Sequence, residues 1–320
     1  MLIYTLRRIN LFVITLLIIS VVSYSILRLD PTSTWSILDF WEGWRTYLSE
    51  VTNLNFGLNA SGRPISDEIF VVFAATLELC LLAFLLALII GIPLGTLSGV
   101  RRGKPLDKFI SFVATAAYAA PLYWIALLLM LLLSLQWELL PVSGRYNPLF
   151  DIETVTGFAI VDTLISPSPH KGDALQSVLL HLVLPCSVLA IPPATQLVRL
   201  MRSSVAQVMS ENFIRVAKIR GLSSYQIIVK HVLRNAFPPI IPMLGVQLAS
   251  MLTFAIITES IFSWPGIGRW LLDALAMRDY VSIQAGVLVV ASFVLFTQIL
   301  SDLIGTLINP LARKEWYVNR

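Results

Sequence analysis

Residues 213–231 read FIRVAKIRGLSSYQIIVKH, a basic and polar stretch in a chain that is otherwise strongly apolar. Hydrophobic side chains make up 57% of the 320 residues and charged ones only 13%, whereas a soluble protein carries roughly 25% charged residues. The mean hydropathy is +0.79. Because the apolar runs on both sides of this stretch are long enough to cross about 30 Å of hydrocarbon, the sequence predicts an all-α polytopic membrane protein.

Six apolar runs predict six transmembrane helices. Their approximate bounds are 9–29, 69–100, 109–135, 178–200, 239–262 and 283–308. The first run is longer than the roughly 7–15 apolar residues of a signal peptide, so we expect it to be retained as a span.

The distribution of lysine and arginine predicts the orientation. Sixteen of these residues fall at the two termini and in the loops at 101–108 and 199–237, and seven fall in the alternate loops. Since cytoplasmic loops carry the excess of positive charge, both termini and the 213–231 stretch are expected in the cytoplasm.

One of the loops on the outer side is rich in tryptophan. Trp35, Trp41 and Trp44 lie at near-helical spacing between the first two spans. The pattern is typical of an amphipathic helix that rests on the membrane interface. Contact with an external partner is the alternative.

The pattern of the 213–231 stretch predicts two short helices joined by a tight elbow. The first helix carries one face formed by Phe213, Val216, Ala217 and Arg220, with Arg215 and Lys218 beside it. Gly221 ends this helix, because glycine accepts positive φ most easily. Ser223 and Gln226 have the spacing of a capping box that starts the second helix. Such a loop either rests on anionic lipid head groups or docks a cytoplasmic protein.

This part of the chain resembles a known family. The segments RVAKIRG (215–221) and HVLRNAFPP (231–239) are similar to the EAA loop of binding-protein-dependent ABC importers of the dipeptide/oligopeptide permease type. In that family the loop forms the coupling helix that sits in a groove of the ATPase subunit. The sequence departs from the family pattern at Arg215, which takes the place of the acidic residue, and at Val216, which takes the place of the first alanine.

Further signatures extend the resemblance over nearly the whole chain. They are MLIYTLRRI (1–9), GRPI (62–65), IIGIPLGTLSGVRRG (89–103), ITESIFSWPGIGRWLLDALAMRDY (257–280) and NPLARKEW (309–316). Within the family, the chain resembles the B-type permease of the Sap peptide transporters through ATLELCLLAF (75–84), LLPVSGRYN (139–147), GFAIVDTLIS (157–166) and KEWY (314–317).

The resemblance implies a type I ABC importer permease fold in the bacterial inner membrane. It implies an N-terminal transmembrane helix with a periplasmic loop, residues 1–68, and a permease core of five transmembrane helices, residues 69–320, with the coupling loop at 201–237. The implied partners are a homologous second permease, two cytoplasmic ATPase subunits, a periplasmic substrate-binding protein and membrane lipid, with no nucleic acid. The implied cargo is peptides, including cationic or antimicrobial ones, with a polyamine as the alternative in the Sap branch.

Several functions are disfavoured by missing motifs. The sequence contains no G-x-x-x-x-G-K-[ST] phosphate-binding loop and no hydrolase motif. These missing motifs lead us to expect no catalytic residue and no cofactor, and because the three histidines have no ligand spacing we expect no metal. The chain is therefore predicted to be a transport subunit rather than an enzyme. The alternatives are a secondary transporter or channel that needs no ATPase, and a scaffold protein.

Two kinds of intramembrane residue are candidates for function. Gly91, Gly95 and Gly99 form a small-residue face, which favours close helix packing or a moving interface with the partner permease. Glu78 and Glu259 lie in the outer halves of their spans, and an unpartnered acid there would be costly. The resemblance implies a structural or gating role for Glu259, and contact with a cationic substrate is one hypothesis for Glu78.

Overall fold

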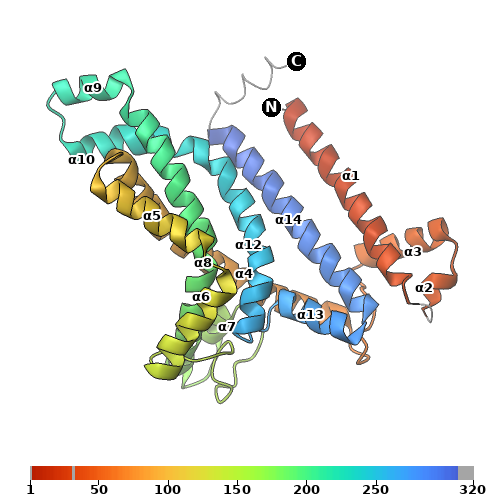
Figure 1. Ribbon diagram of the computed structural model, residues 1–320. Coiled ribbons are helices and arrows are strands. Elements are labelled where there is room, and N and C mark those ends of the chain that lie inside the picture. Colours follow the sequence, from red (N-terminus) through yellow and green to blue (C-terminus); the bar gives the residue numbers. More distant parts are fainter. Residues whose placement is uncertain (1, 31–32, 309–320) are drawn as a thin grey trace. The chain divides into compact units, whose positions relative to one another are not determined.

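The computed structural model describes residues 2–30 and 33–308, and this part of the chain is almost entirely helical (Figure 1). Its helices are α1 (Leu2–Leu27), α2 (Thr34–Ile37), α3 (Phe40–Thr52), α4 (Ile65–Val100), α5 (Pro105–Ala119), α6 (Leu122–Leu129), η1 (Met130–Gln136), α7 (Ala159–Ile165), α8 (Lys171–Met209), α9 (Asn212–Ile219), α10 (Ser224–Gln226), η2 (Ile227–Val232), α11 (Leu233–Ala236), η3 (Pro238–Ile240), α12 (Ile241–Ile261), α13 (Ile267–Met277) and α14 (Tyr280–Ile308). The NPLARKEW signature and the C-terminal tail lie outside the described residues.

Five helical segments are long and apolar enough to cross a membrane. They are Thr5–Leu27, Ile65–Val100, Lys171–Met209, Ser224–Ile261 and Tyr280–Ile304. A sixth candidate consists of two helices, Pro105–Ala119 and Leu122–Gln136, which are bent by 98° at their junction. The all-α polytopic class is thus confirmed, and the described residues contain five candidate spans, or six if the bent pair is counted as one span.

The break in the third span has a local cause. Ala120 has ψ 135°, which is extended rather than helical. It precedes Pro121, and the proline ring disfavours helical backbone at the preceding residue. The prediction of one continuous helix over 109–135 was therefore wrong at this point.

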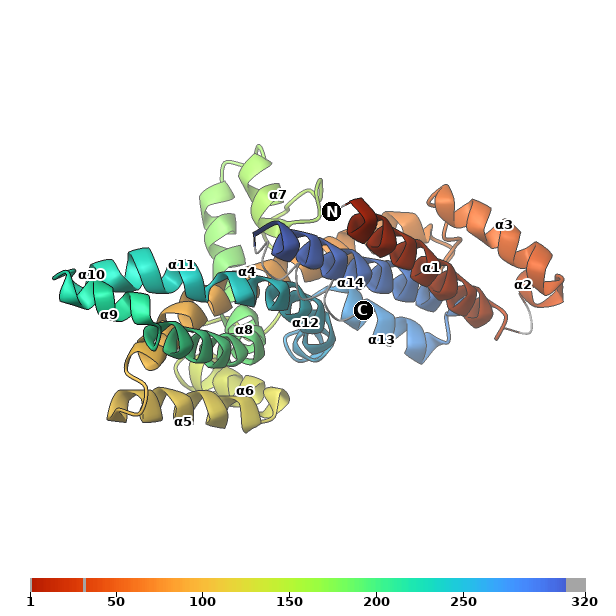
Figure 2. The ribbon, with the colours of Figure 1, turned by 90° about the horizontal axis from the view of Figure 1, so that it is seen from above.

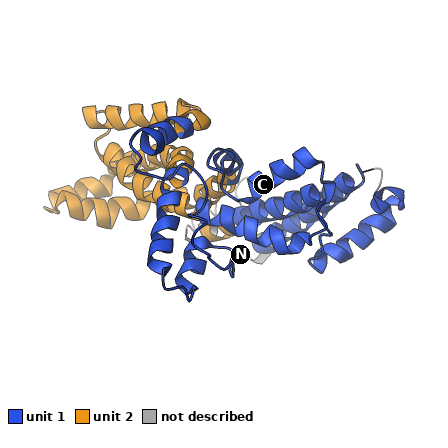
Figure 3. Ribbon diagram, turned by 90° about the horizontal axis from the view of Figure 1, so that it is seen from below, with its two compact units in different colours: residues 1–79, 126–185, 252–299 blue, residues 80–125, 186–251, 300–320 orange. Residues whose placement is uncertain are grey.

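The chain divides into two compact units that interleave along the sequence (Figure 3). The first contains residues 1–79, 126–185 and 252–299, and the second contains residues 80–125, 186–251 and 300–320.

In the first unit, the aromatic helix α3 is attached to α1 and α14. Trp44 donates its indole N–H to the Ser20 hydroxyl at 3.1 Å, and the Tyr47 hydroxyl donates to Gln284 Oε1 at 2.6 Å. Burial raises the pKa of the Tyr47 phenol well above its usual range. Trp41, in contrast, is 61% exposed. The helix α3 therefore packs one aromatic face against α1 and α14 and leaves Trp41 exposed.

The second unit is built on α4, α5 and α8. Ile110 and Ala114 of α5 pack against Val198 of α8 in a small buried cluster. The chain leaves α8 through α9, turns, and returns through α10, η2 and α11 toward α12 (Figure 2). This return produces a helical hairpin.

Candidate functional site

Residues 212–236 form a hairpin of short helices, here called the basic hairpin. Its elbow is Gly221, with φ +76°, in the left-handed region where side chains other than glycine are strained. The next helix begins with the expected capping box. The Gln226 N–H donates to the Ser223 hydroxyl at 3.3 Å, and the Ser223 N–H donates to Gln226 Oε1 at 3.1 Å. Local hydrogen bonds therefore fix the turn.

Buried apolar side chains hold the two arms of the basic hairpin in place. Ile214 and Ala217 are the buried residues of α9, and Ile227 and Val232 are those of η2. The two elements pack against each other (Figures 1 and 2). At its end, the hairpin is fastened to α8, because the Ser204 hydroxyl donates to the Ala236 carbonyl at 2.7 Å.

The outer surface of the basic hairpin is both apolar and cationic. Of the four residues expected on one face of α9, Ala217 is buried, whereas Phe213, Val216 and Arg220 are exposed. Ile219 is 85% exposed and Tyr225 is 75% exposed. Arg215 and Lys218 are exposed as well. Large apolar side chains in this number, on an ordered surface, are typical of an interaction site.

The small-residue face of α4 lies directly against α8. A Cβ atom built on Gly91 would stand 2.6 Å from the Leu197 Cβ, and one on Gly95 would stand 2.5 Å from the Met201 Cβ. The corresponding distance from Gly99 to the Val205 Cβ is 2.7 Å. Both series advance by four residues, so the two helices run in the same direction and touch at every turn. Only glycine leaves room for this approach.

One buried ion pair in the second unit was not singled out from the sequence. The Arg202 side chain donates to Asp107 from Nε at 2.5 Å and from Nη2 at 2.9 Å. Asp107 also accepts the Gly103 N–H at 2.8 Å and the Ser98 hydroxyl. The acid is 1% exposed. Asp107 thus joins the end of α4 and the start of α5 to α8. Its partner on α8, Arg202, lies about three turns before the basic hairpin begins.

In the first unit, Glu259 of α12 is fully buried and binds the start of α13. Its Oε2 accepts the Arg269 N–H at 3.0 Å, and its Oε1 accepts the Thr76 hydroxyl at 2.5 Å. The Thr76 oxygen in turn accepts the Ile267 N–H at 2.8 Å. A carboxylate at a helix N-terminus satisfies amides that have no partner within the helix. Glu259 therefore fixes the SWPG turn against α4.

A second buried acid of the first unit, Glu78 of α4, binds the start of another helix in the same way. Its side chain is 3% exposed and pairs with Arg145 Nη2 at 2.5 Å. It also accepts the Ala159 N–H at 3.1 Å and the Ile160 N–H at 2.8 Å, at the first turn of α7. Arg145 Nη2 donates further to the Gly157 carbonyl at 2.6 Å. The carboxylate is thus surrounded by donors from the chain itself.

Comparison with known proteins identifies the family. The family model for the binding-protein-dependent transport system inner membrane component matches residues 91–314. This match covers more than half of the chain. The chain belongs to this family.

Named relatives of this permease align over most of its length. The peptide transport system permease protein SapB of Salmonella typhimurium is 44% identical over 321 residues, covering 100% of both chains. The putrescine export system permease protein SapB of Escherichia coli (strain K12) is 42% identical, also with 100% of both chains covered. The dipeptide transport system permease protein DppB of the same strain is 38% identical, covering 86% of this chain and 81% of the relative.

A solved structure supports the fold of this permease. The MetNI methionine ABC transporter, in an inward-facing conformation, matches with a TM-score of 0.56 over 73% of this chain and 93% of its own. The sequence identity is 14%, so this likeness concerns the fold alone. Together with the family match, it confirms the type I importer permease fold and a multi-pass protein of the inner membrane.

Proposed function

We propose that this permease forms one half of the substrate pathway of an ATP-driven transporter. A homologous second permease would supply the other half. Two cytoplasmic ATPase subunits would drive transport and a periplasmic binding protein would deliver the cargo. Both termini would then lie in the cytoplasm, and residues 69–320 would form the permease core around the matched range 91–314.

The basic hairpin is the observation that carries this proposal. A cationic loop that only rested on lipid head groups would need no fixed elbow and no capping box. The basic hairpin has both, and it holds the exposed side chains of Ile219 and Tyr225 on an ordered backbone. Mixed apolar and basic surfaces of this kind suit a groove of another protein better than water. The proposed partner that supplies this groove is the ATPase subunit.

The proposed cargo is a peptide, because relatives at 44% and 38% identity carry that name. A polyamine is the second candidate, since one relative at 42% identity is named for putrescine export. We propose that Glu78 and Glu259 serve the pathway indirectly, by fixing α7 and α13. Each is already surrounded by donors of the chain, which leaves little capacity for a cationic ligand.

Replacing one exposed side chain tests the docking role. Ile219→Asp places a charge on the proposed interface without disturbing a buried contact, because Ile219 is 85% exposed. The permease should reach the membrane in normal amounts and lose its ATPase subunits on purification. The matched control is Ile37→Asp, at 83% exposure on α2. Equal retention of the ATPase subunits by both variants would contradict the proposal.

A further inference from the structure

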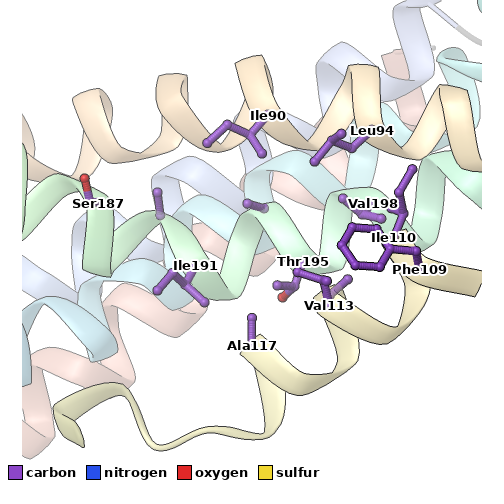
Figure 4. A pocket seen from close by; sticks show the side chains of 13 residues that line it. Ile90, Leu94, Phe109, Ile110, Val113, Ala117, Ser187, Ile191, Thr195 and Val198 are labelled. Carbon is purple, nitrogen blue, oxygen red and sulfur yellow. The ribbon is translucent and has the colours of Figure 1, made fainter. Parts of the chain in front are cut away.

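An apolar groove runs along α8 in the second unit, between α4 and α5 (Figure 4). Its cavity has a volume of about 270 Å³. Ile90 and Leu94 line it from α4, Phe109 and Val113 line it from α5, and residues 187–198 of α8 form its floor. Phe109 is 65% exposed and Val113 is 47% exposed, so the groove opens along α5.

The lining excludes a hydrophilic occupant. Of the 13 side chains, only Ser187 and Thr195 carry a polar atom. The Thr195 hydroxyl already donates to the Pro192 carbonyl at 2.9 Å. A peptide backbone or a polyamine in this groove would lose its hydrogen bonds to water and gain almost none. The three helices that form the groove are among the candidate membrane segments, so a hydrocarbon chain is the chemically suitable occupant.

Cations lie beyond the end of the groove that Leu94 and Phe109 mark. They are Arg101, Arg102 and Lys104 in the turn from α4 to α5, and Lys108 in the first turn of α5, all of them exposed. The only acid in this segment is Asp107, which is engaged by Arg202. The positive charge of the turn is therefore not balanced locally. The lysine and arginine count also assigns this turn to the cytoplasmic side, where the lipid leaflet is rich in anionic head groups.

We propose that this groove and the adjacent cations form a binding site for one anionic phospholipid. One acyl chain lies along α8 between Leu94 and Val113. The phosphate faces Lys104 and Lys108 at the start of α5. Basic pockets between transmembrane helices on the cytoplasmic side bind anionic lipid head groups in this way. The lipid would also cover the packed contact between the α4 glycines and α8, on the side that faces α5.

Photolabelling tests the proposal on the complete transporter, with all of its subunits present. The complex is placed in phosphatidylcholine nanodiscs that contain a little phosphatidylglycerol with a photoactivatable acyl chain. Label is expected on peptides from α4, α5 and α8 that line the groove. Lys104→Gln with Lys108→Gln should weaken this labelling about 25-fold at low salt, from about fivefold per cation. The charge control is Arg45→Gln with Lys171→Gln, two exposed cations that lie outside the groove and outside the basic hairpin.

A second variant pair tests the groove itself. Ala117→Trp fills it from α5, whereas Ala116→Trp adds the same ring at an exposed position that does not line it. Only Ala117→Trp should abolish the labelling, and the second permease should copurify with both variants. Three results would overturn the proposal. These are equal labelling by a phosphatidylcholine probe, no loss with Ala117→Trp, and loss of the second permease with Ala117→Trp, which would mean that a helix of that subunit occupies the groove.

Discussion

At the scale of single residues, buried acids of the permease accept hydrogen bonds from the backbone N–H groups in the first turns of two helices. Glu259 does so for α13 and Glu78 does so for α7. Both acids are visible in the sequence as charges inside apolar runs. Their partners are not, because Arg145 lies 67 residues from Glu78 and the contact arises only when the loop between η1 and α7 folds back onto α4. The ion pair of Asp107 with Arg202, 95 residues apart, was missed for the same reason.

Glu78→Gln should destabilise the folded protein, and it should therefore reduce the transport of every cargo to the same extent. The substitution leaves Arg145 buried without its counter-charge, and breaking a buried pair costs about 3–5 kcal/mol. Thermal unfolding of the purified complex measures the loss. Glu78→Met with Arg145→Met should recover part of it, because no buried charge remains. The exposed control is Asp173→Asn, whose pair with His170 is solvated.

The opposite outcome for Glu78 would restore the substrate-contact hypothesis. In that case Glu78→Gln would leave the unfolding temperature unchanged and would reduce transport of cationic peptides more than that of neutral ones.

The elbow of the basic hairpin permits a test of backbone conformation alone. Nothing lies within 4 Å of a Cβ placed on Gly221, so a side chain there meets no steric obstacle. Gly221→Val should nevertheless strain the positive φ by about 1–2 kcal/mol and reduce ATPase binding. Gly221→Asn should bind nearly normally, because asparagine tolerates this region. If the valine variant retains the ATPase subunits as well as the asparagine variant does, the elbow has no role in docking.

At the scale of elements, the contact between α4 and α8 depends on the absence of side chains. Gly95→Ala would place a Cβ 2.8 Å from the Val198 carbonyl oxygen, which belongs to a helix backbone and cannot move alone. Overpacking of this kind costs about 1–3 kcal/mol, and we expect a lower unfolding temperature. Gly172→Ala is the control, since its Cβ would meet open space. An unchanged unfolding temperature for Gly95→Ala would mean that the two helices separate without cost.

The helices of the basic hairpin also show which features could be predicted from local sequence. The capping box at Ser223 and the stop at Gly221 were predictable, because both depend on neighbours within four residues. The orientation of α9 was not. Its expected face included Ala217 together with exposed Phe213, whereas the buried pair is Ile214 and Ala217. A short helix with apolar residues on two sides does not reveal which side is covered.

At the scale of the whole molecule, apolar run length predicted the membrane spans, and proline position did not predict the break. Pro93 lies inside α4, and α8 also contains Pro185, Pro192 and Pro193 without ending. Pro121 instead separates α5 from α6. All of these prolines look alike in the sequence. Packing of the surrounding helices decides which one interrupts a span.

The predicted topology can be read with reporter fusions. Fusions at Glu50 and Phe150 should be active on the periplasmic side, and those at Lys104 and Tyr225 on the cytoplasmic side. The reason is the excess of lysine and arginine in the loops of the second pair. A cytoplasmic signal from the fusion at Phe150 would require a different number of spans between α4 and α8.

The source of energy is the central claim, and uptake by proteoliposomes tests it most directly. The permease is reconstituted with its second permease, ATPase subunits and binding protein, or alone, and given a labelled cationic peptide or putrescine. Transport should require ATP and every subunit, and Ile219→Asp should abolish it while Ile37→Asp does not. Transport by the permease alone, driven by an ion gradient without ATP, would contradict the account and identify a secondary transporter.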